Sequence, residues 1–254
     1  MCGKIYTAAG VPKVKDVAAM KIFEVTMIIK GLQKLTLLDF PGEIGCTVFL
    51  GGCNFRCPFC HNASIVLPDR QAENISEEQF FDFLDSRRGK LTGVCISGGE
   101  PTLNPGLEDF ISRIRSRGLK VKLDTNGYIP DRLRALVDKG LVDYVAMDIK
   151  NSKKRYGETV GIDNFDPTPV AESARLLMEG RVDFEFRTTV VRELHDAESI
   201  AEIGRWLRGN EKFYLQTFTD SGDLLMSGLP ACSSDEMEGF AKILREYIPS
   251  VSVR

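Results

Sequence analysis

The sequence predicts an α/β fold in which parallel strands form a curved sheet covered by helices. Short runs rich in Val, Ile, Phe and Thr, which are typical of strands, alternate with amphipathic helical patterns through most of the chain. Six such strand–helix units follow one another, and serial units of this kind build a parallel sheet with helices outside. Right-handed crossovers would curl that sheet into a full or partial barrel, or a doubly wound sheet, and the pattern alone leaves this choice open.

The individual elements follow from local patterns. The expected strands are 46–50, 93–97, 120–125, 144–149, 184–190 and 213–218. Helices are expected between them because apolar residues recur at helical spacing, most clearly at Leu107, Phe110, Ile111 and Ile114. Capping-box patterns at Ser76 with Gln79 and at Ser233 with Glu236 mark the start of two helices. Four helices should end near glycines, at Gly89, Gly140, Gly180 and Gly209.

Length and composition limit the class of protein. The chain has 254 residues, of which 43% are hydrophobic, so it can build a sizeable core in one large domain or two small ones. Its net charge of −3 argues against nucleic acid as a partner. It has no apolar run of about 18 residues, so we expect no membrane span. Lys21 and Glu24 interrupt the apolar stretch 17–29, which makes it a poor signal peptide, and we expect a cytoplasmic protein.

The first 26 residues read as separate from the rest. Met27 begins a fresh pattern and is a candidate initiator, although an ordinary N-terminal strand or helix is an equal alternative for residues 1–26. We therefore predict an N-terminal extension at 1–26 and a core domain at 27–254.

Three cysteines follow the first expected strand: Cys53, Cys57 and Cys60. Cysteine thiolates commonly hold iron–sulfur clusters, and three of them on one loop can bind a cubane with one iron left open for catalysis. Zinc is an alternative, but a structural zinc site normally takes four ligands. His61 directly follows Cys60, which makes a shared tetrahedral geometry awkward. Buried free thiols are expected for the widely spaced cysteines, which are Cys2, Cys46, Cys95 and Cys232.

A glycine-rich motif follows the second expected strand, where ligands bind in parallel α/β folds. Gly98 and Gly99 allow backbone to approach a ligand closely. Glu100 supplies a carboxylate that suits an ammonium group. A plain turn is the alternative for this segment taken alone.

Charged residues follow or lie in the next three strands. Asp124 precedes Asn-Gly, so it is either part of a turn or an acid that faces a cavity. Asp148 and Lys150 are two apart on a strand and point to one face, either in a pocket or as a surface ion pair. Arg187 could pair with a carboxylate or extend from the sheet into solvent. A lone histidine is more often structural, so His195 receives no assigned role.

The Cys-x3-Cys-x-aromatic-Cys motif resembles the signature of the radical S-adenosylmethionine (SAM) superfamily. The resemblance implies that Cys53, Cys57 and Cys60 hold a [4Fe–4S] cluster whose fourth iron is chelated by the amino and carboxylate groups of SAM. It implies that Phe59 packs near the adenine. It also implies a partial (β/α)6 TIM-like barrel, with which the six units agree.

The later motifs extend this resemblance. Gly98-Gly99-Glu100 resembles the GGE motif that binds the SAM amino group. The segments 124–127 and 148–150 resemble those of glycyl-radical-enzyme activases, which implies that Asp124, Asp148 and Lys150 lie near the ribose and methionyl parts of SAM. Arg187 is a candidate partner of the SAM carboxylate. The implied chemistry is oxidoreductase chemistry: a low-potential donor such as flavodoxin or ferredoxin reduces the cluster, and SAM is cleaved to methionine and a 5′-deoxyadenosyl radical.

Residues 31–42 point to a substrate. They resemble the N-terminal arm of activating enzymes for anaerobic ribonucleoside-triphosphate reductase, which implies hydrogen abstraction from a glycine of a large glycyl-radical partner. Activases of pyruvate formate-lyase tend to carry a histidine near the end of the sixth strand, and the stretch 215–218 lacks one. The alternatives are such an activase, a radical SAM enzyme acting on a small molecule such as a deazapurine precursor, or a non-catalytic iron–sulfur or zinc module.

Overall fold

The computed structural model of the protein describes residues 27–66, 74–220 and 222–254. The predicted extension at 1–26 lies outside these ranges, so the boundary at Met27 stays a prediction. Within the described ranges, none of the helices combines the length and apolar character needed to cross a bilayer.

A single eight-stranded sheet organises the described chain, and the strands lie in the sheet in the order in which they occur in the sequence. The strands are β1 Ile29–Thr36, β2 Gly45–Leu50, β3 Gly93–Gly98, β4 Lys120–Thr125, β5 Tyr144–Asp148, β6 Asp183–Val190, β7 Lys212–Thr217 and β8 Ser250–Val253. Strand β1 is antiparallel to β2, and every later pair of neighbours is parallel.

This strand order decides between the two topologies that the sequence left open. A doubly wound sheet reverses its strand order part-way, and this sheet does not. Successive crossovers of one hand therefore curl it in one direction. Among the described strands β1 and β8 do not pair with each other, so the barrel is partial, as the resemblance implied.

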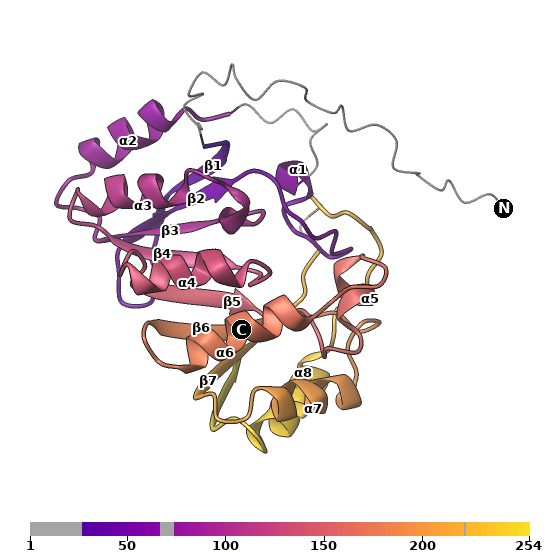
Figure 1. Ribbon diagram of the computed structural model, residues 1–254. Helices are drawn as coiled ribbons and strands as arrows, with labels where there is room; N and C mark the ends of the chain where they lie inside the picture. Colours follow the sequence, from indigo (N-terminus) through magenta and orange to yellow (C-terminus); the bar gives the residue numbers. More distant parts are fainter. Residues whose placement is uncertain (1–26, 67–73, 221) are drawn as a thin grey trace, which may run out of the picture.

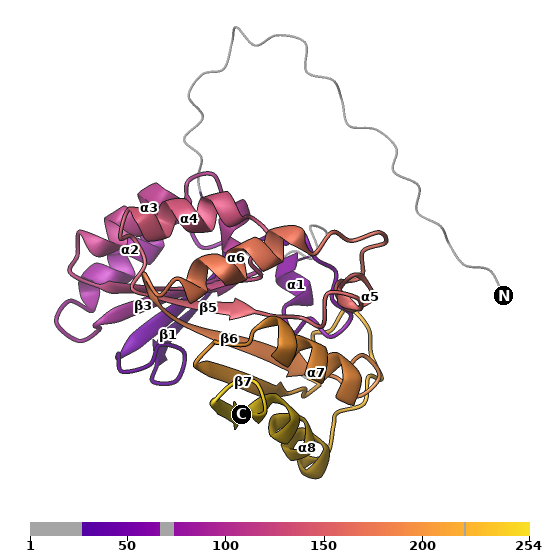
Figure 2. The ribbon, with the colours of Figure 1, turned by 60° about the horizontal axis from the view of Figure 1, so that its bottom comes forward.

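Helices cover the outer face of the curved sheet (Figures 1 and 2). The α-helices of the described residues are α1 Ala63–Val66, α2 Glu77–Ser86, α3 Leu107–Arg115, α4 Pro130–Asp138, α5 Tyr156–Val160, α6 Thr168–Met178, α7 Ala197–Trp206 and α8 Ser234–Arg245, and all but α1 and α5 belong to this outer layer. The predicted capping boxes are confirmed: Ser76 caps α2 with Gln79, and Ser233 caps α8 with Glu236. The short helices α1 and α5 were not predicted. They lie at the same end of the sheet (Figures 1 and 2).

The six predicted strands correspond to β2 through β7, each within one residue at either end. Alternate residues of these strands face opposite sides of the sheet. In β4, Val121 and Leu123 are fully buried in the core, while Lys122 and Asp124 form an ion pair on the other face, inside the barrel. The barrel interior is therefore polar. The free thiols predicted to be buried are confirmed for the described members, Cys46, Cys95 and Cys232.

Candidate active site

A cavity of about 420 Å³ lies where the parallel strands end. Ten of the eleven predicted site residues line it, which are Cys53, Cys57, Phe59, Cys60, Gly98, Gly99, Asp124, Asp148, Lys150 and Arg187. The carboxyl ends of neighbouring parallel strands meet at one edge of the sheet, so motifs that are far apart in the sequence come together there. Glu100 is the exception.

The cysteine loop forms one wall of the cavity between α1 and α5. Its backbone is held by Gly52 N–H to the Ile65 carbonyl at 3.1 Å and by Arg56 N–H to the Val160 carbonyl at 2.8 Å. Burial raises the pKa of the Cys53 thiol to about 11 and that of Cys57 to about 12. Binding to iron would displace these thiol protons, as metal binding does for cysteine ligands generally.

The donor set fits an iron–sulfur cube. The three cysteines lie within eight residues on one loop and line one cavity. In the described part of the chain, no group of three or more His, Cys, Asp or Glu side chains is arranged so that it could bind a single metal ion. Thiolates that hold a cubane each bind a different iron, so they need not converge on one point.

Gly98 and Gly99 approach protein backbone rather than open space. A Cβ atom on Gly98, whose φ is +119°, would lie 2.3 Å from the Leu50 carbonyl oxygen. A Cβ atom on Gly99 would lie 1.9 Å from the Gly52 carbonyl oxygen. The end of β3 thus packs directly on the start of the cysteine loop, and the two glycines also border the cavity.

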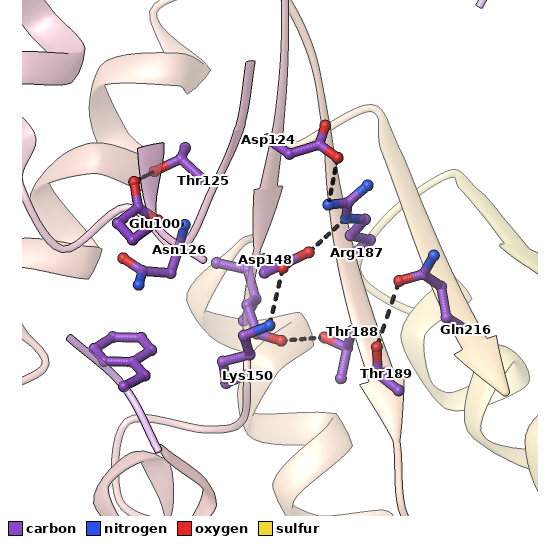
Figure 3. A network of polar contacts seen from close by, with 12 residues as sticks. Glu100, Asp124, Thr125, Asn126, Asp148, Lys150, Arg187, Thr188, Thr189 and Gln216 are labelled. Carbon is purple, nitrogen blue, oxygen red and sulfur yellow. Dashed lines mark hydrogen bonds and ion pairs between the residues drawn. The ribbon is translucent and has the colours of Figure 1, made fainter. Parts of the chain in front are cut away.

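The predicted role of Glu100 is not supported by its position. Its side chain is fully buried and does not line the cavity. The carboxylate accepts hydrogen bonds from Thr102 N at 3.0 Å, Thr102 Oγ1 at 2.5 Å, Thr125 Oγ1 at 2.7 Å and Asn126 N at 2.7 Å. Burial raises the pKa of Glu100, although these bonds oppose the rise. Glu100 therefore joins the ends of β3 and β4 (Figure 3) and does not face the cavity.

The charged residues of β4, β5 and β6 form one connected network inside the barrel (Figure 3). Arg187 Nη2 lies 3.1 Å from Asp124, and Lys150 Nζ lies 2.9 Å from Asp148. Burial alone would raise the pKa of Asp148, but Arg187 and Lys150 outweigh it and hold that pKa well below its ordinary value. Asp148 and Lys150 are thus neither a surface pair nor freely solvated, since their side chains are only 24% and 16% exposed.

Sequence reasoning missed several cavity residues. Asn126 donates from Nδ2 to Asn54 Oδ1 at 2.8 Å, which ties the end of β4 to the cysteine loop. Gln216 and Thr189 line the cavity from β7 and β6, and their side chains face each other (Figure 3). Asp39 reaches the cavity from the turn after β1. Asn126 and Gln216 lie in motifs that the sequence had already singled out, and their positions at strand ends were the available signal.

The sequence profile of the radical SAM superfamily matches residues 47–207, a stretch that includes the cysteine loop and the charged network. The chain belongs to the radical SAM superfamily. This confirms the predicted family and its cofactors, which are a [4Fe–4S] cluster and SAM. Of the alternatives that the sequence left open, a zinc module and a non-catalytic module do not fit this membership.

Curated relatives of this radical SAM enzyme include activating enzymes and a synthase. A protein of Methanocaldococcus jannaschii, provisionally named a glycyl-radical enzyme activating enzyme, is 30% identical over 233 residues, covering 89% of this chain and 95% of its own length. A 7-carboxy-7-deazaguanine synthase of Methanopyrus kandleri is 30% identical, covering 52% and 57%. A pyruvate formate-lyase-activating enzyme of Clostridium pasteurianum is 32% identical, covering 48% and 52%. The first of these relatives places the enzyme among the glycyl-radical activating enzymes.

Solved structures support the fold. The crystal structure of Streptococcus suis SuiB has a TM-score of 0.61 and 14% identity, with 80% of this chain and 47% of that chain covered. At this identity the likeness concerns the fold alone.

Proposed function

We propose that this radical SAM enzyme generates a glycyl radical on a large partner enzyme, and that the partner is an anaerobic ribonucleoside-triphosphate reductase. The observation that carries the first part is the cysteine wall facing the charged network across one cavity, in a barrel that stays open between β1 and β8. A relative provisionally named as such an activating enzyme aligns over 95% of its own length, which supports the same reading.

The cavity residues divide the work of binding SAM. When bound and reduced by a low-potential donor such as flavodoxin or ferredoxin, the cluster and SAM together supply a 5′-deoxyadenosyl radical that can take hydrogen from a glycine Cα. Cys53, Cys57 and Cys60 hold the cluster. Lys150 and Arg187 are the cations that can face the SAM carboxylate, since the network of Lys122, Asp124, Arg187, Asp148 and Lys150 carries three positive and two negative charges.

Other residues of the cavity contact SAM or keep water away from it. Backbone groups of Gly98 and Gly99 replace Glu100 as the groups of this motif that reach the cavity. Phe59 is buried in the cavity wall, where an adenine ring can pack on it. Together with Phe55 it keeps water from the wall beside the cysteines.

The turn after β1 supports a protein substrate. Asp39 faces the cavity and accepts a hydrogen bond from Thr47 Oγ1 at 2.5 Å. The neighbouring Leu37 and Leu38 are 67% and 89% exposed. One short turn thus reaches the cavity and also presents apolar side chains to the surface, as contact with a partner protein requires. Gln216, in the strand where activases of pyruvate formate-lyase tend to carry histidine, favours the reductase as that partner.

The test combines cluster content, SAM cleavage and radical formation. The enzyme is reconstituted without oxygen with iron and sulfide, and 5′-deoxyadenosine formed from SAM and dithionite is measured. Cys57→Ala should lose most of its iron and all cleavage, while the matched Cys232→Ala, at a buried thiol outside the loop, should keep both.

Partner choice is read by electron paramagnetic resonance. The enzyme is mixed with an anaerobic ribonucleoside-triphosphate reductase or with pyruvate formate-lyase, and the glycyl radical doublet is recorded. A doublet on the reductase alone supports the proposal, and a doublet on pyruvate formate-lyase alone overturns the partner. SAM cleavage that rises with a deazaguanine precursor, with no doublet on either protein, would favour the small-molecule alternative.

A further inference from the structure

The chain leaving β5 toward the cavity makes one last backbone bond to β6, from Ile149 N–H to the Arg187 carbonyl at 2.9 Å, and is otherwise fixed by side chains. The Ile149 carbonyl accepts from Thr188 Oγ1 at 2.5 Å. Lys150 N–H donates to the Tyr156 hydroxyl at 3.2 Å. The Lys150 carbonyl lies 2.8 Å from His195 Nε2. Three side chains from different parts of the fold thus hold two consecutive residues at the point where the chain enters the cavity wall.

Among these three side chains, His195 is the one whose hydrogen bonds and burial fix its protonation state. It is 3% exposed and lies beyond the end of β6. Its Nδ1 lies 3.1 Å from Val191 N and 3.2 Å from the Val191 carbonyl oxygen. Its Nε2 lies 2.8 Å from the Lys150 carbonyl oxygen, which can only accept, so the proton of the neutral ring is on Nε2 and Nδ1 accepts from Val191 N–H. Nε2–H then donates to the Lys150 carbonyl. Burial lowers the pKa of His195, so the neutral ring that this arrangement needs is the form present at neutral pH.

We propose that His195 is a positioning residue that aims Lys150 into the cavity. By holding the Lys150 carbonyl it fixes the backbone two residues beyond Asp148, where strand pairing has ended. The Lys150 side chain then turns back to Asp148, with Nζ at 2.9 Å, instead of swinging into solvent. The inference rests on the proposed function in one respect, since Lys150 matters for SAM only if its ammonium group faces SAM there.

A matched pair of variants separates the two hydrogen bonds that the His195 ring makes, one with Val191 and one with Lys150. The amide nitrogen of Gln in His195→Gln falls near the place of Nε2, so it keeps the donor to Lys150 and loses the acceptor for Val191. The amide oxygen of Asn in His195→Asn falls near Nδ1, so it keeps the acceptor for Val191 and loses the donor to Lys150. Each variant removes the ring and one hydrogen bond, so a purely structural role predicts the same effect for both.

The readouts are SAM affinity and melting temperature of the cluster-loaded enzyme. Both variants should lower the melting temperature by similar amounts. His195→Asn should weaken SAM binding about tenfold, as expected for the loss of one aligned contact, while His195→Gln should stay within about threefold of the parent. Equal weakening in the two variants, in step with the melting temperature, would overturn the proposal.

A double-mutant cycle shows whether the effect passes through Lys150. Lys150→Gln should weaken SAM binding, and adding His195→Asn to it should cause no further loss. A further tenfold loss in the double variant would contradict the proposal, and so would an unchanged affinity of Lys150→Gln. The outcome is independent of radical transfer: a lack of glycyl radical on any partner would remove the proposed function while the affinity pattern still decides the role of His195.

Discussion

Arg187 donates a hydrogen bond from Nε to Asp148 Oδ1, with the two atoms 2.5 Å apart, inside the barrel and largely out of solvent. The same guanidinium also reaches Asp124, so one cation compensates carboxylates from two different strands. Removing one member of a buried ion pair leaves an uncompensated charge, which costs far more than losing a surface pair. The network therefore contributes to the folding of the strand ends, in addition to the SAM binding that we propose for it.

Replacing this arginine should destabilise the enzyme strongly. We expect Arg187→Met to lower the free energy of unfolding by about 2–3 kcal/mol, because Asp124 and Asp148 each lose a buried charged hydrogen-bond donor although Lys122 and Lys150 still balance their charge. Urea denaturation under anaerobic conditions measures the change. Arg181→Met is the control, because Arg181 pairs with Asp138 on the surface and its loss should cost less than about 1 kcal/mol. Equal losses for the two variants would mean that the network is solvated.

A substitution at Glu100 tests whether this residue joins the ends of β3 and β4 or contacts SAM directly. Glu100→Gln puts an amide NH2 where the carboxylate now accepts donors, so we expect a loss of about 2–3 kcal/mol in stability. Any loss of SAM affinity should follow this destabilisation. A large loss of SAM affinity with unchanged stability would instead restore direct contact between Glu100 and SAM. Glu108→Gln, at a half-exposed surface pair with Lys139, is the matched control and should leave both quantities nearly unchanged.

The close approach of Gly99 to the cysteine loop predicts a cluster defect. Gly99→Ala should push the backbone at Gly52 away and lower the iron bound per chain after reconstitution, since a Cβ atom would overlap the Gly52 carbonyl. Gly239→Ala is the comparison, because a Cβ atom on Gly239 meets nothing within 4 Å and the residue lies inside α8. There alanine should keep the iron and stabilise the helix by about 0.5–1 kcal/mol. Full iron binding by Gly99→Ala would refute the packing argument.

The buried neutral His195 predicts how stability depends on pH. Its pKa is lower in the folded protein than the ordinary value of 6.5, so the unfolded chain binds the proton first as pH falls. The contribution of His195 is complete above pH 6.5 and is lost as pH falls below that value toward the folded pKa. The pKa of His61 is also lowered, so the parent is compared with His195→Gln, which keeps His61. The difference in melting temperature between the two should shrink from pH 7.5 to pH 5.5, and a constant difference would count against a neutral ring.

The fold was largely readable because helices and central strands have strong local patterns. β2, β3 and β5 are mostly apolar, while β4, β6 and β7 alternate apolar with polar residues. Most of the helices between them carry apolar residues at helical spacing. β1 and β8 were missed for a physical reason: each is an edge strand with a single neighbour, so it needs less apolar surface. β1 mixes Lys30, Gly31 and Lys34 into its run, and β8 is only four residues long.

The sequence by itself predicted ten of the residues that line the cavity, because in a serial parallel sheet each motif that follows a strand must arrive at the same edge. Only the tertiary structure decided what each side chain touches. Glu100 looked like a ligand but is surrounded by Thr102, Thr125 and Asn126, which come from two strand ends. His195 received no role from the sequence, yet its Nε2 lies 2.8 Å from the carbonyl oxygen of Lys150, 45 residues earlier in the chain. Motifs specify where a residue lies, while hydrogen-bond partners distant in sequence are set only when the strands pack together.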